Sequence, residues 1–278
     1  MKALLTVTLA VLLIGGASAQ WNDCDNVPYS PGFYLQGYPA FSTATKGYDA
    51  DGNSVDWGST WSAFGFCLNP TYYGMLGEKR WAVGAYVPFN SYSPAVGESQ
   101  SGIGDIQLSA AYWVIDDHKN GKYFSVWFWS DLPIGDDAKG LGTGQINLRP
   151  GIGWGMEKFP YQIETSVYYN LRLKGTYTVL GTEVDIKPGN EIWALASFGY
   201  GVNEQMMPAL EIETGWGVDG KIDDVAWPDS KEQWLKLGPS FSYQVNPNAN
   251  IEFSGLYTVM GKNTAQSIDI AARVTWGF

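Results

Sequence analysis

The last twelve residues of the chain, SIDIAARVTWGF (267–278), alternate between two kinds of side chain. An apolar residue stands at every second position from Ile268 to Phe278, and Asp269 and Arg273 fall between them. A period of two is typical of a β-strand, because successive side chains point to opposite sides. One face of this strand must therefore meet an apolar environment and the other a polar one.

The same alternation recurs along the chain between segments rich in turn-forming residues, and it predicts twelve strands. We expect them at about 32–45, 60–74, 80–91, 103–115, 122–133, 144–157, 161–174, 190–202, 207–219, 233–245, 249–260 and 266–278. Closed barrels of bacterial outer membranes contain an even number of antiparallel strands. The strand count therefore favours a closed barrel.

The connections between the predicted strands differ in length in a regular way. Those after even-numbered strands are short, as at 158–160 and 203–205, whereas most after odd-numbered strands are long, as at 46–60 and 176–189. Outer-membrane barrels have short periplasmic turns and longer extracellular loops. We therefore predict an all-β fold in which residues 32–278 form a closed antiparallel transmembrane β-barrel of about twelve strands.

The apolar face of each strand is expected to point outward, to lipid. A small soluble ligand barrel would show the same period with the opposite facing, but such barrels have eight strands. Charged residues make up only 16% of the chain, against roughly 25% in soluble domains. Aromatic residues reach 15%, which suits the aromatic girdles of a membrane barrel.

The N-terminus predicts export. Lys2 is followed by an apolar run over 3–14 and by the small residues of 15–19, the arrangement of a cleaved secretory signal peptide over 1–19. The apolar run is shorter than the roughly 20 residues that a membrane helix needs. We expect localisation in the bacterial outer membrane, with 20–31 as a periplasmic or lumenal segment before the barrel. Cys24 and Cys67 are a candidate disulfide in this oxidising compartment.

Polar and aromatic residues share the predicted inward face. The predicted pore-lining residues are Asp105, Trp113, Trp127, Trp129, Arg149, Glu164, Arg172, Glu211, Glu213, Lys236, Glu252, Asp269 and Arg273. Asp131, Lys174 and Glu191, together with Tyr86, Tyr168 and Trp193, are expected on the same face. The charges could screen solutes or form mutually neutralising pairs that stiffen a narrow barrel. The aromatic residues could form a track for apolar solutes or pack to fill the interior. Both alternatives stay open for each group.

Other classes of function are disfavoured. The single histidine, His118, lies in a predicted short turn with no nucleophile beside it, so we predict no enzyme and no catalytic residues. One histidine and two cysteines do not support a zinc site, and no motif predicts a cofactor. The formal net charge of −11 argues against nucleic acid as a partner, because phosphate binding needs clustered Lys and Arg.

Five segments occur in an order that resembles one known family. They are SGIGDIQLSAAYW (101–113), LPIGD (132–136), YYNL (168–171), KPGNE (187–191) and LGPSFSY (237–243). The chain resembles, over about 57–278, the outer-membrane proteins named after the meta-pathway of phenol degradation. This resemblance implies a β-barrel transporter that admits aromatic or other hydrophobic compounds, and it implies no active site.

These observations together predict the function and partners of the chain. We expect passive passage of small solutes, with a structural or adhesive barrel, its lumen filled by side chains, as the alternative. The expected partners are outer-membrane lipid, lipopolysaccharide and a small solute. The terminal Phe278 also resembles the signal that the outer-membrane assembly machinery reads.

Overall fold

The computed structural model of the chain describes residues 31–95, 97–117, 119–179, 182–246 and 248–278. The predicted signal peptide, nearly all of segment 20–31, Cys24 and His118 lie outside the described residues. Predictions that concern them, including the Cys24–Cys67 disulfide, stay predictions. Cys67 itself is half-buried beside the cluster of Tyr38 and Ala40.

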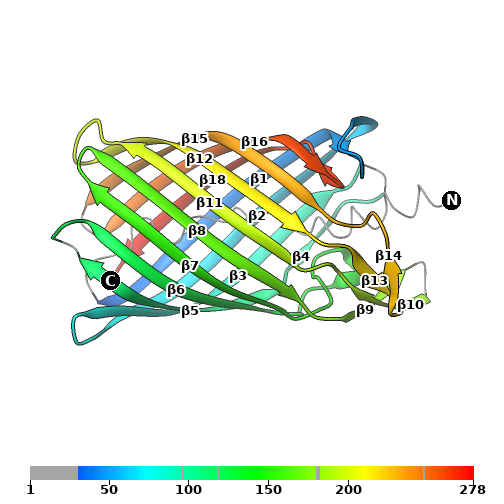
Figure 1. Cartoon of the computed structure of the whole chain (residues 1–278), viewed down its shortest axis with the longest axis horizontal. Helices are drawn as coiled ribbons and strands as arrows, with labels where there is room; N and C mark the ends of the chain where they lie inside the picture. Colours follow the sequence, from blue (N-terminus) through cyan, green and yellow to red (C-terminus); the bar gives the residue numbers. More distant parts are fainter. Residues whose placement is uncertain (1–30, 96, 118, 180–181, 247) are drawn as a thin grey trace.

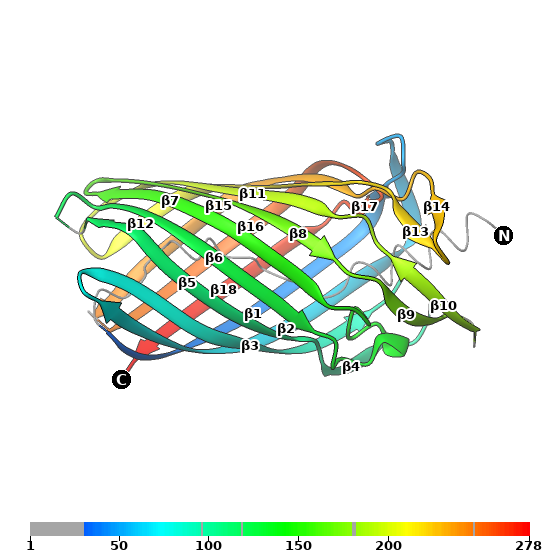
Figure 2. The same cartoon turned by 60° about the horizontal axis from the view of Figure 1, so that its bottom comes forward.

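Twelve antiparallel strands close into one barrel (Figures 1 and 2). They are β1 (Gly32–Tyr48), β2 (Ser54–Leu76), β3 (Lys79–Ser93), β5 (Ile106–Asp117), β6 (Lys122–Leu132), β7 (Asn147–Lys158), β8 (Tyr161–Arg172), β11 (Glu191–Tyr200), β12 (Met206–Gly217), β15 (Gln233–Asn246), β16 (Ala249–Lys262) and β18 (Ile268–Gly277). Strand β18 pairs with β1, and β1 pairs with β2. Closure leaves no unpaired backbone edge, which hydrocarbon requires. The predicted fold class is confirmed.

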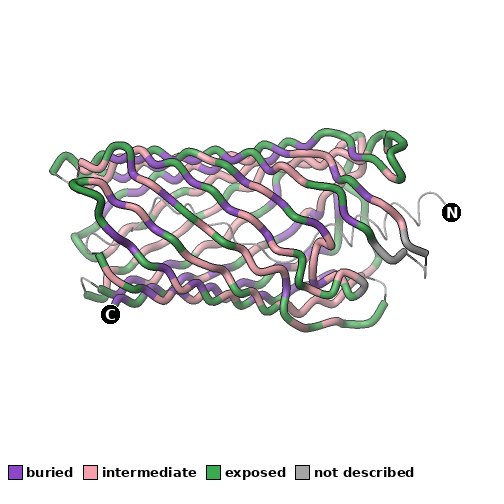
Figure 3. Tube along the Cα trace, turned by 90° about the horizontal axis from the view of Figure 1, so that it is seen from below, coloured by how far each residue is buried: buried purple, intermediate pink, exposed green. Residues whose placement is uncertain are grey.

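Exposed and buried residues alternate along the strands, as Figure 3 shows. On β18, Ile270 is 56% exposed and Arg273 is 2% exposed. On β8, Val167 is 44% exposed, whereas the adjacent Ser166 is buried. The apolar side chains therefore point outward and the polar ones inward, as predicted. No helix in the described ranges is long and apolar enough to cross a membrane.

The connection after β1 is shorter than predicted. Sequence patterning predicts a loop over 46–60, but β1 and β2 stay paired as far as Tyr48 and Ser54. The Asp49 carboxylate accepts hydrogen bonds from the amides of Asp51 and Asn53 at 3.0 and 2.8 Å. These local bonds close a tight turn, so the hairpin extends where a loop is expected.

Two predicted loops, 176–189 and the connection 220–233 between the predicted strands 207–219 and 233–245, contain strands of their own. Strands β9 (Gly175–Val179), β10 (Thr182–Lys187), β13 (Gly220–Ile222) and β14 (Val225–Trp227) form a second, four-stranded sheet. Ile186 is buried in it against Val184, Ile222 and Trp227. The sheet lies at the end of the barrel that carries the long connections (Figure 1). The sequence pattern does not predict these short strands, because their sheet forms only when the two loops meet. Strand β10 of one loop pairs with β13 of the other, and β9 and β14 complete the two hairpins.

Candidate functional site: the interior of the barrel

A continuous chain of aromatic rings runs along the inward side of five strands. Successive ring centroids are 4.5–6.2 Å apart. This aromatic chain consists of Tyr34 on β1, Tyr73 on β2, Trp113 on β5, Trp127 and Trp129 on β6, and Tyr168 on β8. Its contacts are tilted, stacked or edge-to-face, and the edge-to-face arrangement is among those that aromatic rings prefer. The sequence predicts four of these residues on the inward face but not Tyr34 and Tyr73.

Glycines on β7 make room for the large rings of neighbouring strands. A Cβ atom added at Gly151 would overlap the ring of Tyr168, and one added at Gly155 would overlap the ring of Tyr123. The Tyr123 hydroxyl donates a hydrogen bond to Glu164, which is fully buried. These glycines are therefore required by close packing inside the barrel.

Replacing Gly155 by alanine is expected to lower the free energy of unfolding by about 1–3 kcal/mol, the usual effect of overpacking. The added methyl group displaces the Tyr123 ring and with it the hydrogen bond to Glu164. Urea unfolding followed by tryptophan fluorescence measures the change. In a Tyr123→Ala background the same substitution should cost much less, because the overlapping ring is gone. Equal costs in the two backgrounds would contradict this packing.

The alternation of side chains along the sequence does not predict a buried ion pair at the short-turn end of the barrel. Arg80 bonds both carboxylate oxygens of Asp116, at 2.6 and 2.8 Å, and its Cζ lies 4.9 Å from the centroid of the Trp113 ring. A β-bulge shifts the register between Trp113 and Ile115. Val114 and Ile115 are both exposed as a result, and Asp116 turns inward, opposite to strict alternation.

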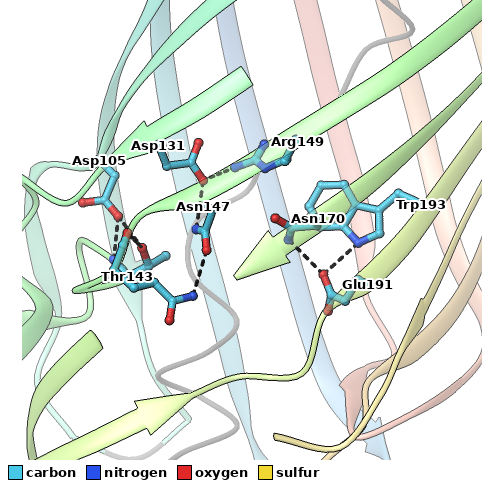
Figure 4. A network of polar contacts seen from close by, with 9 residues as sticks. Asp105, Asp131, Thr143, Asn147, Arg149, Asn170, Glu191 and Trp193 are labelled. Carbon is cyan, nitrogen blue, oxygen red and sulfur yellow. Dashed lines mark hydrogen bonds and ion pairs between the residues drawn. The ribbon is translucent and has the colours of Figure 1, made fainter. Parts of the chain in front are cut away.

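Two polar networks lie farther toward the long loops (Figure 4). In the first, Arg149 pairs with Asp131, which also accepts a hydrogen bond from Asn147 at 3.0 Å. Arg149 further lies over Trp193, with Cζ 5.4 Å from the ring centroid. These contacts join β6, β7 and β11 across the inward face.

The second network surrounds Glu191, which is 1% exposed. Its Oε2 accepts from Asn170 at 3.2 Å and from the Trp193 indole at 2.9 Å, and its Oε1 pairs with Arg172 at 2.5 Å. Glu232, just before β15, lies in the same environment. Burial raises the pKa of Glu232 to about 8; the charge of Glu191 adds to this and that of Arg172 opposes it.

A third group of charges spans β12, β15, β16 and β18. Lys236 lies between Glu213, at 3.7 Å, and Asp269, at 3.0 Å. Arg273 pairs with Glu252 at 2.5 Å, and both side chains are at most 5% exposed. Five of the predicted carboxylates and bases thereby become direct ion-pair partners across strands.

Asp105 holds a loop rather than pairing with another charged side chain. It follows β4 (Gln100–Ile103), which pairs with β3, so the barrel strand predicted at 103–115 begins only at Ile106, as β5. Its carboxylate accepts a hydrogen bond from the Gly135 amide at 3.0 Å. It also accepts from the amide and hydroxyl of Thr143 at 2.6 and 2.7 Å (Figure 4). Asp105 therefore anchors the connection between β6 and β7, and its pore-lining role stays a prediction.

Lys174 lies in the connection between β8 and β9 and not on the inward face where it is expected, because β8 already ends at Arg172. It pairs with Asp185 at 2.8 Å and with Asp224 at 3.4 Å. The hydrogen bond between Lys174 and Asp185 raises the pKa of the ammonium group and lowers the pKa of the carboxyl group. This exposed pair fastens β10 to the end of the barrel wall.

The structure brings the predicted interior residues into a few contiguous groups. The aromatic chain contains Trp113, Trp127 and Trp129, and the ion pairs contain Arg149, Arg172, Glu213, Lys236, Glu252, Asp269 and Arg273. Glu164 and Glu211 also lie on inward faces. The period of two on β3 could have identified Arg80. Within the described residues, no three His, Cys, Asp or Glu side chains are grouped to hold a metal ion.

The closed barrel with an apolar outer face and a polar, aromatic interior defines this chain as a β-barrel protein of the outer-membrane type. The model of the family described as "Putative MetA-pathway of phenol degradation" matches residues 46–274. The chain belongs to this family.

Solved structures with the same fold include several outer-membrane proteins. The crystal structure of the COG4313 outer membrane channel from Pseudomonas putida F1 is 13% identical, with a TM-score of 0.82 over 94% of this chain and 100% of that chain. The TodX deltaS2S3 mutant monoaromatic hydrocarbon channel is 10% identical, with a TM-score of 0.53 over 96% and 94%. The translocator domain of the autotransporter NalP from Neisseria meningitidis is 13% identical, with a TM-score of 0.52 over 92% and 91%. No curated protein matches the chain.

Proposed function

We propose that this protein is an outer-membrane channel through which small solutes pass passively, with hydrophobic or aromatic compounds as the favoured class. The aromatic chain is the observation that carries the proposal. Its rings adjoin one another from β1 to β8 on the inward side of a closed barrel. The rings pack against one another and each is at most 7% exposed, so an aromatic solute that enters the interior meets partners for the same ring contacts that they make with one another.

Two comparisons support this proposal. The chain shares its fold with an outer-membrane channel from Pseudomonas putida and with a channel for monoaromatic hydrocarbons. The proposal includes no catalytic step. It also includes export by the N-terminal segment, contact with lipopolysaccharide at the long-loop end, and insertion by the outer-membrane assembly machinery through Phe278.

One observation favours a second candidate, a structural barrel with an interior filled by side chains. Many inward polar groups bond to one another: Glu191, for example, contacts three neighbouring side chains and is 1% exposed. Such pairing stiffens a barrel whether or not a solute passes. Solute flux through the purified protein separates the two candidates.

Replacing Trp129 by alanine is expected to increase ionic conductance and to weaken selection for aromatic solutes. Trp129 stacks on Trp127 and contacts Tyr168, so its removal widens the interior and interrupts the aromatic chain. Loss of one aromatic contact corresponds to a preference lower by about two- to tenfold. Swelling of proteoliposomes in phenylalanine and in leucine, together with planar-bilayer conductance, measures both effects.

Trp154→Ala is the matched control for this experiment. Trp154 lies on the neighbouring strand β7 but is 42% exposed on the outer face. This variant should leave flux and selection unchanged. If the folded wild-type protein shows neither swelling nor conductance, the structural barrel is the correct candidate.

A further inference from the structure

Ionisable side chains are distributed unevenly around the interior. On β3, β5, β6 and β7, Arg80 with Asp116 and Arg149 with Asp131 form two matched pairs. On the inward faces of β8, β11, β12, β15, β16 and β18, as far as these are described, six carboxylates accompany three bases. The carboxylates are Glu164, Glu191, Glu211, Glu213, Glu252 and Asp269, and the bases are Arg172, Lys236 and Arg273.

The bases on this arc are shared between carboxylates. Lys236 serves both Glu213 and Asp269, which are 13% and 20% exposed as side chains. Arg273 forms an ion pair with Glu252 at 2.5 Å. Glu211 lies on the same inward face, two residues before Glu213 on β12. One base between two carboxylates leaves a negative charge uncompensated, so this arc is acidic.

Aromatic rings on the inner wall provide a second, independent indication of affinity for positive charge. The guanidinium group of Arg80 lies over Trp113 and that of Arg149 over Trp193, with Cζ 4.9 and 5.4 Å from the ring centroids. Each of these two rings already has a guanidinium group over one face, and Trp113 is fully buried, so they show that rings in this interior stabilise a desolvated cation. The aromatic chain extends from β1 to β8, and the acidic arc continues from β8 to β18.

The two walls favour the same kind of charge. Carboxylates lining a narrow passage with low-dielectric walls raise the local concentration of cations and repel anions. Aromatic faces add attraction for a cation and for any apolar group that it carries. An anion of the same size would meet repulsion on one wall and the electron-rich faces of the rings on the other.

We propose that this interior selects cations over anions, and that its solutes are small organic ammonium compounds with an aromatic or other apolar group. The inference rests on the proposed channel function and assigns its substrate class. Glu211, Glu213 and Asp269 are the residues that determine the selectivity, because these three carboxylates outnumber the bases that pair with them.

The test is the reversal potential of the purified full-length protein in planar bilayers under a KCl gradient. We expect a potential of the sign that K⁺ permeation produces. Glu213→Gln with Asp269→Asn should at least halve the ratio of K⁺ to Cl⁻ permeability, and Glu211→Gln alone should lower it in the same direction. Glu78→Gln with Glu98→Gln removes two charges from exposed positions outside the interior and should change nothing.

Organic ions test the substrate class directly. In bi-ionic experiments, benzyltrimethylammonium should permeate better than benzenesulfonate, and the difference should shrink in Glu211→Gln. Conductance with anion preference, or with a ratio that none of the interior variants alters, would overturn the cation inference and leave the channel standing. Absence of any current from protein shown to be folded would overturn both.

Discussion

Replacing Arg273 by methionine is expected to lower the free energy of unfolding by about 3–5 kcal/mol, the usual effect of breaking a buried ion pair from one side. Arg273 on β18 and Glu252 on β16 lie 2.5 Å apart, and their side chains are 3% and 5% exposed. The variant leaves the buried Glu252 carboxylate without the Arg273 guanidinium group. Urea unfolding in detergent micelles, followed by tryptophan fluorescence, measures the loss.

The double variant Arg273→Met with Glu252→Met is the control. Replacing both members of a buried pair by apolar side chains of similar volume is often neutral or stabilising. We therefore expect the second substitution to restore most of the stability that the first removes. If the single variant and the double variant were both as stable as the wild-type protein, Glu252 would have to be solvated, and its buried pairing with Arg273 would be contradicted.

Lysine in place of Val167 is expected to destabilise the barrel by about 2–4 kcal/mol, the effect of a basic side chain on the lipid face at the bilayer midplane. Val167 lies in the middle of β8 between Ile152 and Ala194 on the neighbouring strands, and it is 44% exposed. In water a lysine at such an exposed position would cost little. Unfolding in lipid vesicles reports the effect. The fraction of protein whose electrophoretic mobility changes on heating, which is the folded fraction, reports it as well.

Tyr161→Lys on the same strand and the same face is the matched control. Tyr161 begins β8 at the short-turn end and is 58% exposed. The cost of a charge falls to about 0–1 kcal/mol near the interface, so this variant should be almost neutral. Equal effects at the two depths would mean that the outer face does not meet hydrocarbon.

The barrel wall is predictable from sequence because its rule is local. Side-chain direction alternates with period two in any strand, so Val167 and Ser166 are assigned to opposite faces without knowledge of their neighbours. A one-residue slip would place Glu164 or Arg172 in lipid, so the hydrophobic pattern also specifies the register. The predicted segments therefore match the twelve barrel strands closely.

The rule fails where a local irregularity intervenes. The bulge at Trp113/Ile115 reverses the facing of Asp116 and conceals its pairing with Arg80. The side chain of Asp49 closes a turn where a long loop is expected. Bulges and turns closed by a side chain depend on single contacts. A pattern that is read over many residues does not reveal them.

The amino-acid sequence by itself determines the number of strands, the face that meets lipid and the polar, aromatic character of the interior. Only the tertiary structure decides which interior side chains meet. Tyr123 reaches Glu164, 41 residues away, and Arg273 reaches Glu252 because strand stagger sets them at one level. Stagger follows from the pairing of all twelve strands when the barrel closes. The contiguous aromatic chain and the acidic arc therefore form only in the closed barrel.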